Sequence, residues 1–125
     1  MRKLALALIG FSLFLSFHAD LAFAGKAAAS IEAPQAAQKG SEVTIKITAT
    51  HNANSALHYT QWLKVTVNQK EVARWDFSAG KRPEGEVFTR EVKLKAVENM
   101  DVAAEASCNI HGSAGPATTK ISVRD

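Results

Sequence analysis

The sequence predicts an all-β protein, an immunoglobulin-like antiparallel β-sandwich of about seven strands. Three observations lead to this prediction. Apolar and polar residues alternate with a period of two along most of the chain after residue 25, turn-forming residues recur at short intervals, and no segment after residue 25 shows a convincing helical period. Residues 25–125 amount to roughly 100 residues, the usual size of one domain with one core.

The first 24 residues have the features of a signal peptide. Arg2 and Lys3 precede an apolar stretch over residues 4–17, and Ala22-Phe23-Ala24 provides the small residues that a signal peptidase recognises. We therefore expect residues 1–24 to be cleaved and residues 25–125 to form a periplasmic or secreted domain. The apolar stretch is shorter than the roughly 18 residues that span a bilayer, so no stable membrane span is expected, and a retained N-terminal anchor is the minor alternative.

The first expected strands follow directly. Residues 30–33 form a short extended segment that Pro34 ends, which suits the edge of a sheet. From Glu42 to Thr50 every second residue is apolar, as in a half-buried strand. Residues 59–67 repeat the alternation and place Thr60 and Trp62 on the outer face. There Trp62 either packs under a neighbouring loop or covers a site.

The second half of the chain contains the remaining strands and two loops. Asn68-Gln69 predicts a tight turn into a strand over residues 71–78, and the polar loop 79–85 contains two glycines and a proline. The other strands are expected at residues 87–96, 101–108 and 118–123.

Charge gives little support for a nucleic-acid partner. The full chain has a formal net charge of +3, and loss of Arg2, Lys3 and Asp20 with the leader would lower it to about +2. No block of lysines and arginines interrupts the sequence. We therefore expect no nucleic-acid binding.

Cys108 is the only cysteine, so no internal disulfide can form. A single thiol in an exported protein is a buried small hydrophobe, a link in a disulfide-bonded dimer or a metal ligand. His111 lies three residues later, and a thiolate and an imidazole at that spacing in a turn can chelate one ion. His51 and His58 lie at the end of one expected strand and the start of the next, where sandwich loops converge. His18 lies in the leader.

At these residues the sequence resembles the superoxide reductases, a family that includes the neelaredoxins and the iron-centre domain of the desulfoferrodoxins. The resemblance rests on His51 with His58-Tyr59-Thr60-Gln61-Trp62, and on Cys108-Asn109-Ile110-His111-Gly112. It extends over nearly all of residues 25–125. Further agreement lies in Ile31-Glu32-Ala33-Pro34, in Lys39-Gly40 and in residues 43–47.

The resemblance implies one mononuclear non-haem iron, with His51, His58 and His111 as equatorial ligands and the Cys108 thiolate as the axial ligand. It also implies one-electron reduction of superoxide to hydrogen peroxide, with the electron taken from a rubredoxin-like or other redox protein. Lys26 matches a family lysine that steers the superoxide anion, and a solvated lysine is the alternative interpretation. Family members often associate, so a homo-oligomer is a further expectation.

The sequence departs from the family pattern near residue 27. Ala27 stands where a fourth equatorial histidine belongs, and Gly25 stands where a glutamate is common. Water, an exogenous ligand or the new α-amine of Gly25 would fill the open position. Three histidines and one cysteine suit zinc as well as iron. A second hypothesis is therefore a metal-binding or electron-transfer module of the same fold with little superoxide turnover, and a third is a structural sandwich with an incidental cluster.

The two residues between Cys108 and His111 have an expected structural role. Asn109 and Ile110 lie inside the predicted chelating turn. We expect their backbone N–H groups to donate hydrogen bonds to the cysteine sulfur and so to shape the turn, rather than to contact substrate.

Overall fold

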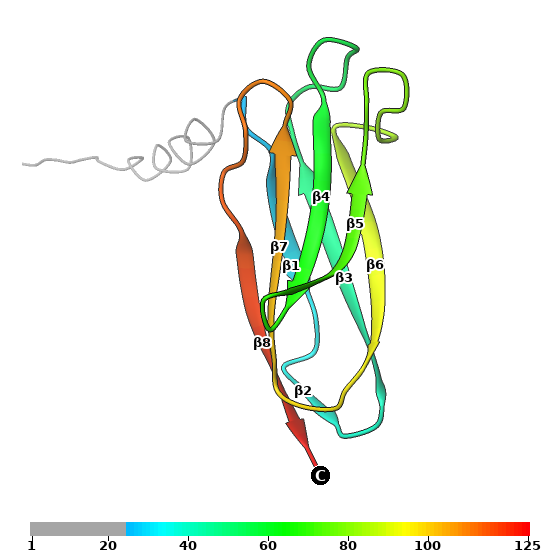
Figure 1. Ribbon diagram of the computed structural model, residues 1–125, viewed down its shortest axis with the longest axis vertical. Helices are drawn as coiled ribbons and strands as arrows, with labels where there is room; N and C mark the ends of the chain where they lie inside the picture. The colour runs from blue at the N-terminus through cyan, green and yellow to red at the C-terminus, as the bar shows by residue number, and fades with distance from the viewer. Residues whose placement is uncertain (1–24) are drawn as a thin grey trace, which may run out of the picture.

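The computed structural model describes residues 25–125, and the expected signal peptide, residues 1–24, lies outside the described residues. Eight strands form two sheets that pack face to face (Figure 1). None of the described segments is a helix long and apolar enough to cross a membrane. The strands are β1 (Ala28–Glu32), β2 (Ala36–Gln38), β3 (Glu42–Thr50), β4 (Thr60–Val67), β5 (Lys70–Asp76), β6 (Val87–Lys95), β7 (Met100–Cys108) and β8 (Ala117–Arg124).

The smaller sheet has the order β1-β3-β6 and the larger the order β2-β8-β7-β4-β5. All pairs are antiparallel except β2 with β8, which run parallel. The predicted all-β sandwich is therefore confirmed. Its eighth strand is the three-residue β2, which the sequence did not indicate. The extended segment before Pro34 is β1, an edge strand as expected.

Alternation and turn chemistry explain the main strands. In β3 the apolar residues at every second position are buried, and the strand pairs along its full length with β6. The β4–β5 hairpin turns at Asn68 and Gln69, whose φ angles are 50° and 72°. Positive φ at both central residues is the geometry of a type I′ turn, which matches the twist of the flanking strands.

The facing predicted for the start of β4 is wrong. Thr60 pairs with Cys108 and Trp62 pairs with Ser107, so β4 contains one extra residue at this point. Such a bulge reverses the facing of side chains on one side of it relative to simple alternation, here those before Trp62. Thr60 is consequently buried, with 1% of its surface exposed, instead of facing solvent.

Trp62 packs against charged side chains of its own sheet. The Nζ atom of Lys64 and the guanidinium carbon of Arg74 each lie 5.2 Å from the centre of its ring. These are distances of cation–π contacts. These contacts support a packing role for Trp62, with its ring against side chains of β4 and β5.

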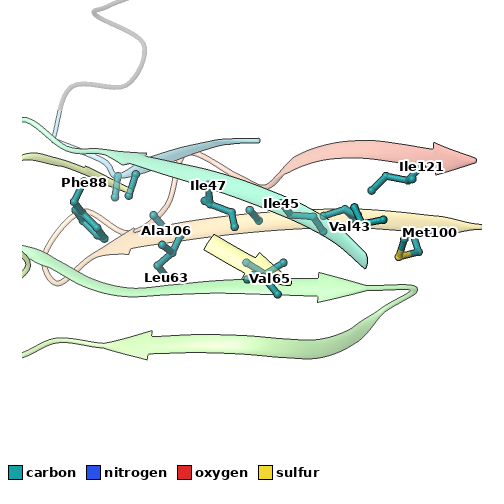
Figure 2. Packing of buried hydrophobic residues seen from close by; sticks show 14 of the residues in the cluster. Val43, Ile45, Ile47, Leu63, Val65, Phe88, Met100, Ala106 and Ile121 are labelled. Carbon is teal, nitrogen blue, oxygen red and sulfur yellow. The ribbon is translucent and has the colours of Figure 1, made fainter. Parts of the chain in front are cut away.

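The core fills the space between the two sheets (Figure 2). Ile45 and Ile47 of β3 are fully buried and face Leu63 and Val65 of β4. Full burial of such side chains stabilises a fold by roughly 1.5–3 kcal/mol each. The buried cluster also includes Ala27 and Cys108. The apolar core therefore extends to the pole where the candidate ligands lie.

Candidate metal centre

The structure brings the four predicted metal-binding side chains together at one pole of the sandwich. His51 directly follows β3, His58 lies two residues before β4, Cys108 ends β7, and His111 follows in the next turn. This pole is the upper end in Figure 1, where the loops after β3 and β7 meet the start of β1. Candidate ligand atoms of His51, His58 and Cys108 lie within 4.8 Å of one another.

His111 joins this group from the solvent side. Its Nδ1 atom lies 3.2 Å from Nε2 of His58 and 3.9 Å from Sγ of Cys108. The ring of His58 lies between the other two, with centroids 4.8 Å from His51 and 4.9 Å from His111. His51 is buried and His111 is exposed. The cluster therefore runs from the core to the surface.

The turn after β7 fixes the sulfur of Cys108. Cys108 and Gly112 exchange two backbone hydrogen bonds, of 2.9 and 3.2 Å. The backbone N–H groups of Ile110 and His111 each donate to Sγ at 3.3 Å. The predicted N–H bonds to sulfur are thus found for Ile110 and not for Asn109, whose N–H donates to the carbonyl of Tyr59 at 3.1 Å. Two such donors place partial positive charge beside the sulfur.

One ring nitrogen of His51 is buried without a hydrogen-bond partner among the described residues. Its backbone N–H donates to the carbonyl of Glu86 at 2.8 Å, and its Nδ1 lies 3.2 Å from Oγ1 of Thr60. Its Nε2 is buried and has no partner among the described residues. A neutral imidazole has one N–H and one lone pair. When Nδ1–H donates to Thr60, the lone pair of Nε2 is free for a metal.

The surroundings of His51 favour its neutral form. Burial lowers its pKa below the ordinary value of 6.5, and the nearby His58 and His111 lower it further. The backbone of Gly25 and the carboxylate of Glu86 raise the pKa of His51 and so offset part of this lowering. Neither of them forms a hydrogen bond with Nε2. Because metals bind neutral imidazole, this environment suits a ligand.

Asn109 connects the two loops that carry the other candidate ligands. Its side-chain amide donates to the carbonyl of Leu57 at 3.2 Å, and its Oδ1 accepts from the backbone N–H of Tyr59 at 2.9 Å. These bonds hold the residues on either side of His58 against the turn after Cys108. Neither Asn109 nor Thr60 was predicted to act this way. The asparagine beside the cysteine was a visible signal, whereas the bulge that turns Thr60 inward was not.

The N-terminal segment lies against the same turn. The N–H of Ala27 donates to the carbonyl of Gly112 at 3.2 Å, and the N–H of Ala114 donates to the carbonyl of Ala27 at 2.9 Å. Ala27 is fully buried. Lys26, the predicted steering residue, is exposed beside it. This position is compatible with attraction of an anion, and that role stays a prediction.

These residues fit a single metal ion. Candidate ligand atoms of His51, His58 and Cys108 lie within 4.8 Å of one another, and Nδ1 of His111 lies 3.2 Å from His58 and 3.9 Å from the sulfur. A buried nitrogen of His51 has no hydrogen-bond partner among the described residues. Nitrogen and sulfur donors of this kind suit iron or zinc and not calcium or magnesium. Assignment of the four side chains as ligands remains a prediction.

A surface pocket with a volume of about 700 Å³ lies away from this pole. It is lined by the end of β4 and its turn, the first residues of β7 and residues 118–120 of β8. No histidine or cysteine is among its lining residues, and its charged pair, Asp101 and Lys120, forms a 2.7 Å ion pair. The donor cluster is therefore the better candidate for a functional site.

Comparisons with known proteins identify one matching family model and several solved structures of similar fold. The family model described as desulfoferrodoxin matches residues 22–113. A superoxide reductase (neelaredoxin) from Ignicoccus hospitalis superposes with a TM-score of 0.66 at 20% identity, with 79% of this chain and 82% of that chain covered. A candidate superoxide reductase from Thermotoga maritima gives 0.59 at 24% identity, with 78% and 86% covered.

The fold also occurs in proteins with other names. The sulfur carrier protein SoxY from Chlorobium limicola f thiosulfatophilum superposes with a TM-score of 0.56 at 12% identity, with 89% of this chain and 96% of that chain covered. No curated protein matches the sequence. At these identities the structural similarities establish the fold alone, so function has to be argued from the site.

Proposed function

The chain belongs to the desulfoferrodoxin family, and on this premise we propose that it is an iron protein of superoxide reductase type. His51, His58, Cys108 and His111 would hold one iron ion and the protein would reduce superoxide to hydrogen peroxide. The observation that supports this most directly is the convergence of three imidazoles and one thiolate at one pole. The buried, unpartnered Nε2 of His51 is its clearest sign.

The reaction consumes one electron and two protons for each superoxide. A bound iron would supply the one-electron redox couple. Cys108 would contribute a negatively charged sulfur, kept in position by the N–H groups of Ile110 and His111. His51 would contribute a neutral nitrogen that Thr60 orients. His111 lies at the exposed edge of the cluster, so water can bring the protons.

The partners and the location of the protein follow from the same proposal. Superoxide is a small anion, and the exposed Lys26 beside the site would raise its local concentration. The electron would come from a rubredoxin-like or other redox protein. The A-x-A sequence before Gly25 supports the proposal that this activity lies in the periplasm or outside the cell.

A second candidate function rests on Ala27. This residue offers no donor atom and is fully buried at the edge of the cluster. A set of three nitrogens and one sulfur satisfies tetrahedral zinc. The alternative is therefore a metal-binding or electron-transfer module of the same fold with little superoxide turnover.

Metal content and colour test the proposal. Protein purified from its own compartment is expected to contain about one iron per chain and, when oxidised, to absorb visible light through thiolate-to-iron charge transfer. Cys108→Ser should remove the band and weaken metal binding more than about a hundredfold, because it removes the only soft anionic donor. Ser107→Ala is the matched control. Ser107 is the buried neighbour of Cys108, and its hydroxyl donates to the Cys108 carbonyl at 3.5 Å rather than to the sulfur.

The outcomes separate the two functions. Iron together with consumption of superoxide by the reduced protein supports the reductase. One equivalent of zinc without visible absorption supports the alternative module. Retention of both colour and metal by the Cys108→Ser variant would show that Cys108 is not a ligand.

A further inference from the structure

The N-terminal segment borders the donor cluster without adding a side-chain ligand to it. Ala27 is fully buried there and has no donor atom. Two backbone hydrogen bonds, from Ala27 to Gly112 and from Ala114 to Ala27, fix residue 27 against the turn that carries Cys108 and His111. The chain just before Ala27 must therefore pass close to the candidate ligands.

Gly25 lies beside His111, one of the candidate ligands. A Cβ atom at this position would lie 2.9 Å from Nδ1 of His111 and 3.1 Å from its Cγ. The Gly25 carbonyl is also close enough to His51 to affect its pKa. The φ angle of Gly25 is +81°, so both space and backbone conformation require glycine. The main chain at residue 25 thus approaches the cluster more closely than any side-chain-bearing residue could.

The backbone nitrogen of Gly25 changes its chemistry if the leader is removed. It lies about 1.5 Å from the α-carbon that packs against His111. As part of a peptide bond this nitrogen is a poor ligand, because its lone pair is delocalised into the carbonyl group. Cleavage after Ala24 would convert it into a primary amine, whose lone pair is not delocalised and can bind a metal.

We propose that the free α-amine of Gly25 is the missing donor of this centre, which it completes with four nitrogens and one sulfur. The inference rests on the proposed function, because it requires a metal held by Cys108 and the histidines. It also has a consequence for maturation. The precursor would hold the ion with four donors only, and removal of the leader would create the fifth, so tight metal binding would follow processing.

Metal affinity of three N-terminal forms tests this inference. The forms are the chain that begins at Gly25, the same chain acetylated at its α-amine, and a chain with one additional alanine before Gly25. Cobalt(II) and zinc(II) binding would be measured by competition with a chromophoric chelator. We expect acetylation and the added alanine each to weaken binding at least about tenfold, because loss of a group that only supports a ligand already costs about tenfold to a hundredfold. Equal affinities of all three forms would overturn the inference.

The reactivity of the amine provides a second readout. Bound metal should protect the Gly25 α-amine from an acylating reagent, and peptide mass spectrometry would report the extent of modification. The ε-amine of the neighbouring, exposed Lys26 is the internal control and should react equally with and without metal. Equal modification of Gly25 in both states would contradict the proposal, as would a mature exported protein whose first residue is not Gly25.

Cys108→Ser distinguishes failure of this inference from failure of the proposed function. Metal binding that depends on Cys108 and is unaffected by acetylation overturns only the role of the α-amine. Absence of metal binding in every form, or binding that is unchanged in Cys108→Ser, overturns both proposals.

Discussion

Thr60 lies within hydrogen-bonding distance of one ring nitrogen of the candidate ligand His51. Its hydroxyl oxygen lies 3.2 Å from Nδ1, while Nε2 is buried without a partner among the described residues. Hydrogen bonds of this kind to the non-ligating nitrogen fix both the tautomer and the ring orientation of metal-binding histidines. Thr60 is therefore a positioning residue, although it does not itself belong to the cluster.

Replacement of Thr60 tests this role. Thr60→Val keeps the shape and removes the hydroxyl, so Nδ1 of His51 loses its partner. We expect metal affinity to fall about tenfold and the free energy of unfolding of the metal-free protein to fall by about 1–3 kcal/mol. Chelator competition and urea unfolding measure the two effects. Thr66→Val, at the half-buried far end of β4, is the control. Equal losses of metal affinity in both variants would refute the assignment.

The sequence identified the candidate ligands and missed their supports for a physical reason. The spacing of Cys108 and His111 can be read directly from the sequence. His51 and His58 are the only other histidines after residue 25, so they were the remaining candidates for metal ligands. The inward position of Thr60 depends on one extra residue in β4 relative to β7. Strand alternation alone assigns the opposite face to Thr60, because a shift of one residue reverses the facing.

At the scale of secondary-structure elements, the site depends on loops that the sheets hold together. The loop between β3 and β4 carries His58, and the turn after β7 carries Cys108 and His111. Asn109 connects them through the carbonyl of Leu57 and the N–H of Tyr59. Without the Asn109 side chain, the two loops would be joined near the site by the pairing of β4 with β7 and by the hydrogen bond from the N–H of Asn109 to the carbonyl of Tyr59.

A variant of Asn109 measures this connection. Asn109→Ala is expected to lower metal affinity about tenfold and the free energy of unfolding by about 1–2 kcal/mol. Asn99→Ala is the matched control, because the Asn99 side chain also accepts a backbone bond, from Val123, at the opposite pole. The control should lose stability and keep its metal affinity. Unchanged metal affinity in Asn109→Ala would show that the strands alone place the loops.

A strand could be predicted from the sequence where its burial leaves an alternating pattern of apolar and polar residues. In β3 the buried positions alternate without interruption, and the structure has the expected bounds, Glu42–Thr50. The strand β2 left no pattern, because it has three residues and pairs in parallel with β8. Its existence depends on a partner that is distant in sequence and becomes a neighbour only after the sandwich forms.

For the whole molecule, the burial of His51 couples stability to pH. Its pKa is lowered in the folded protein by burial first and by His58 second. In the unfolded chain the imidazole gains a proton near pH 6.5, whereas in the folded protein it does so only at lower pH. Between these two values the unfolded state binds more protons. Stability contributed by neutral His51 is therefore present above pH 6.5 and is lost as the pH falls through the lower, folded pKa.

This coupling gives a prediction for the metal-free protein. The free energy of unfolding should decrease as the pH is lowered from about 7 to about 5, and His51→Gln should reduce the slope, because glutamine does not titrate. Urea unfolding at several pH values measures both slopes in the presence of a chelator. Equal slopes in the two proteins would show that other groups cause the pH dependence.

The donor cluster also has a consequence for the entropy of the chain. With one cysteine, the protein has no internal disulfide to restrict its unfolded state. An ion bound by both His51 and Cys108 would link two points far apart in the sequence. A permanent link that closes a loop of about 60 residues lowers the conformational entropy of the unfolded chain, which raises the free energy of the unfolded state by about 4 kcal/mol. Chelation of the ion would therefore loosen this fold in the way that reduction loosens a disulfide-bonded one.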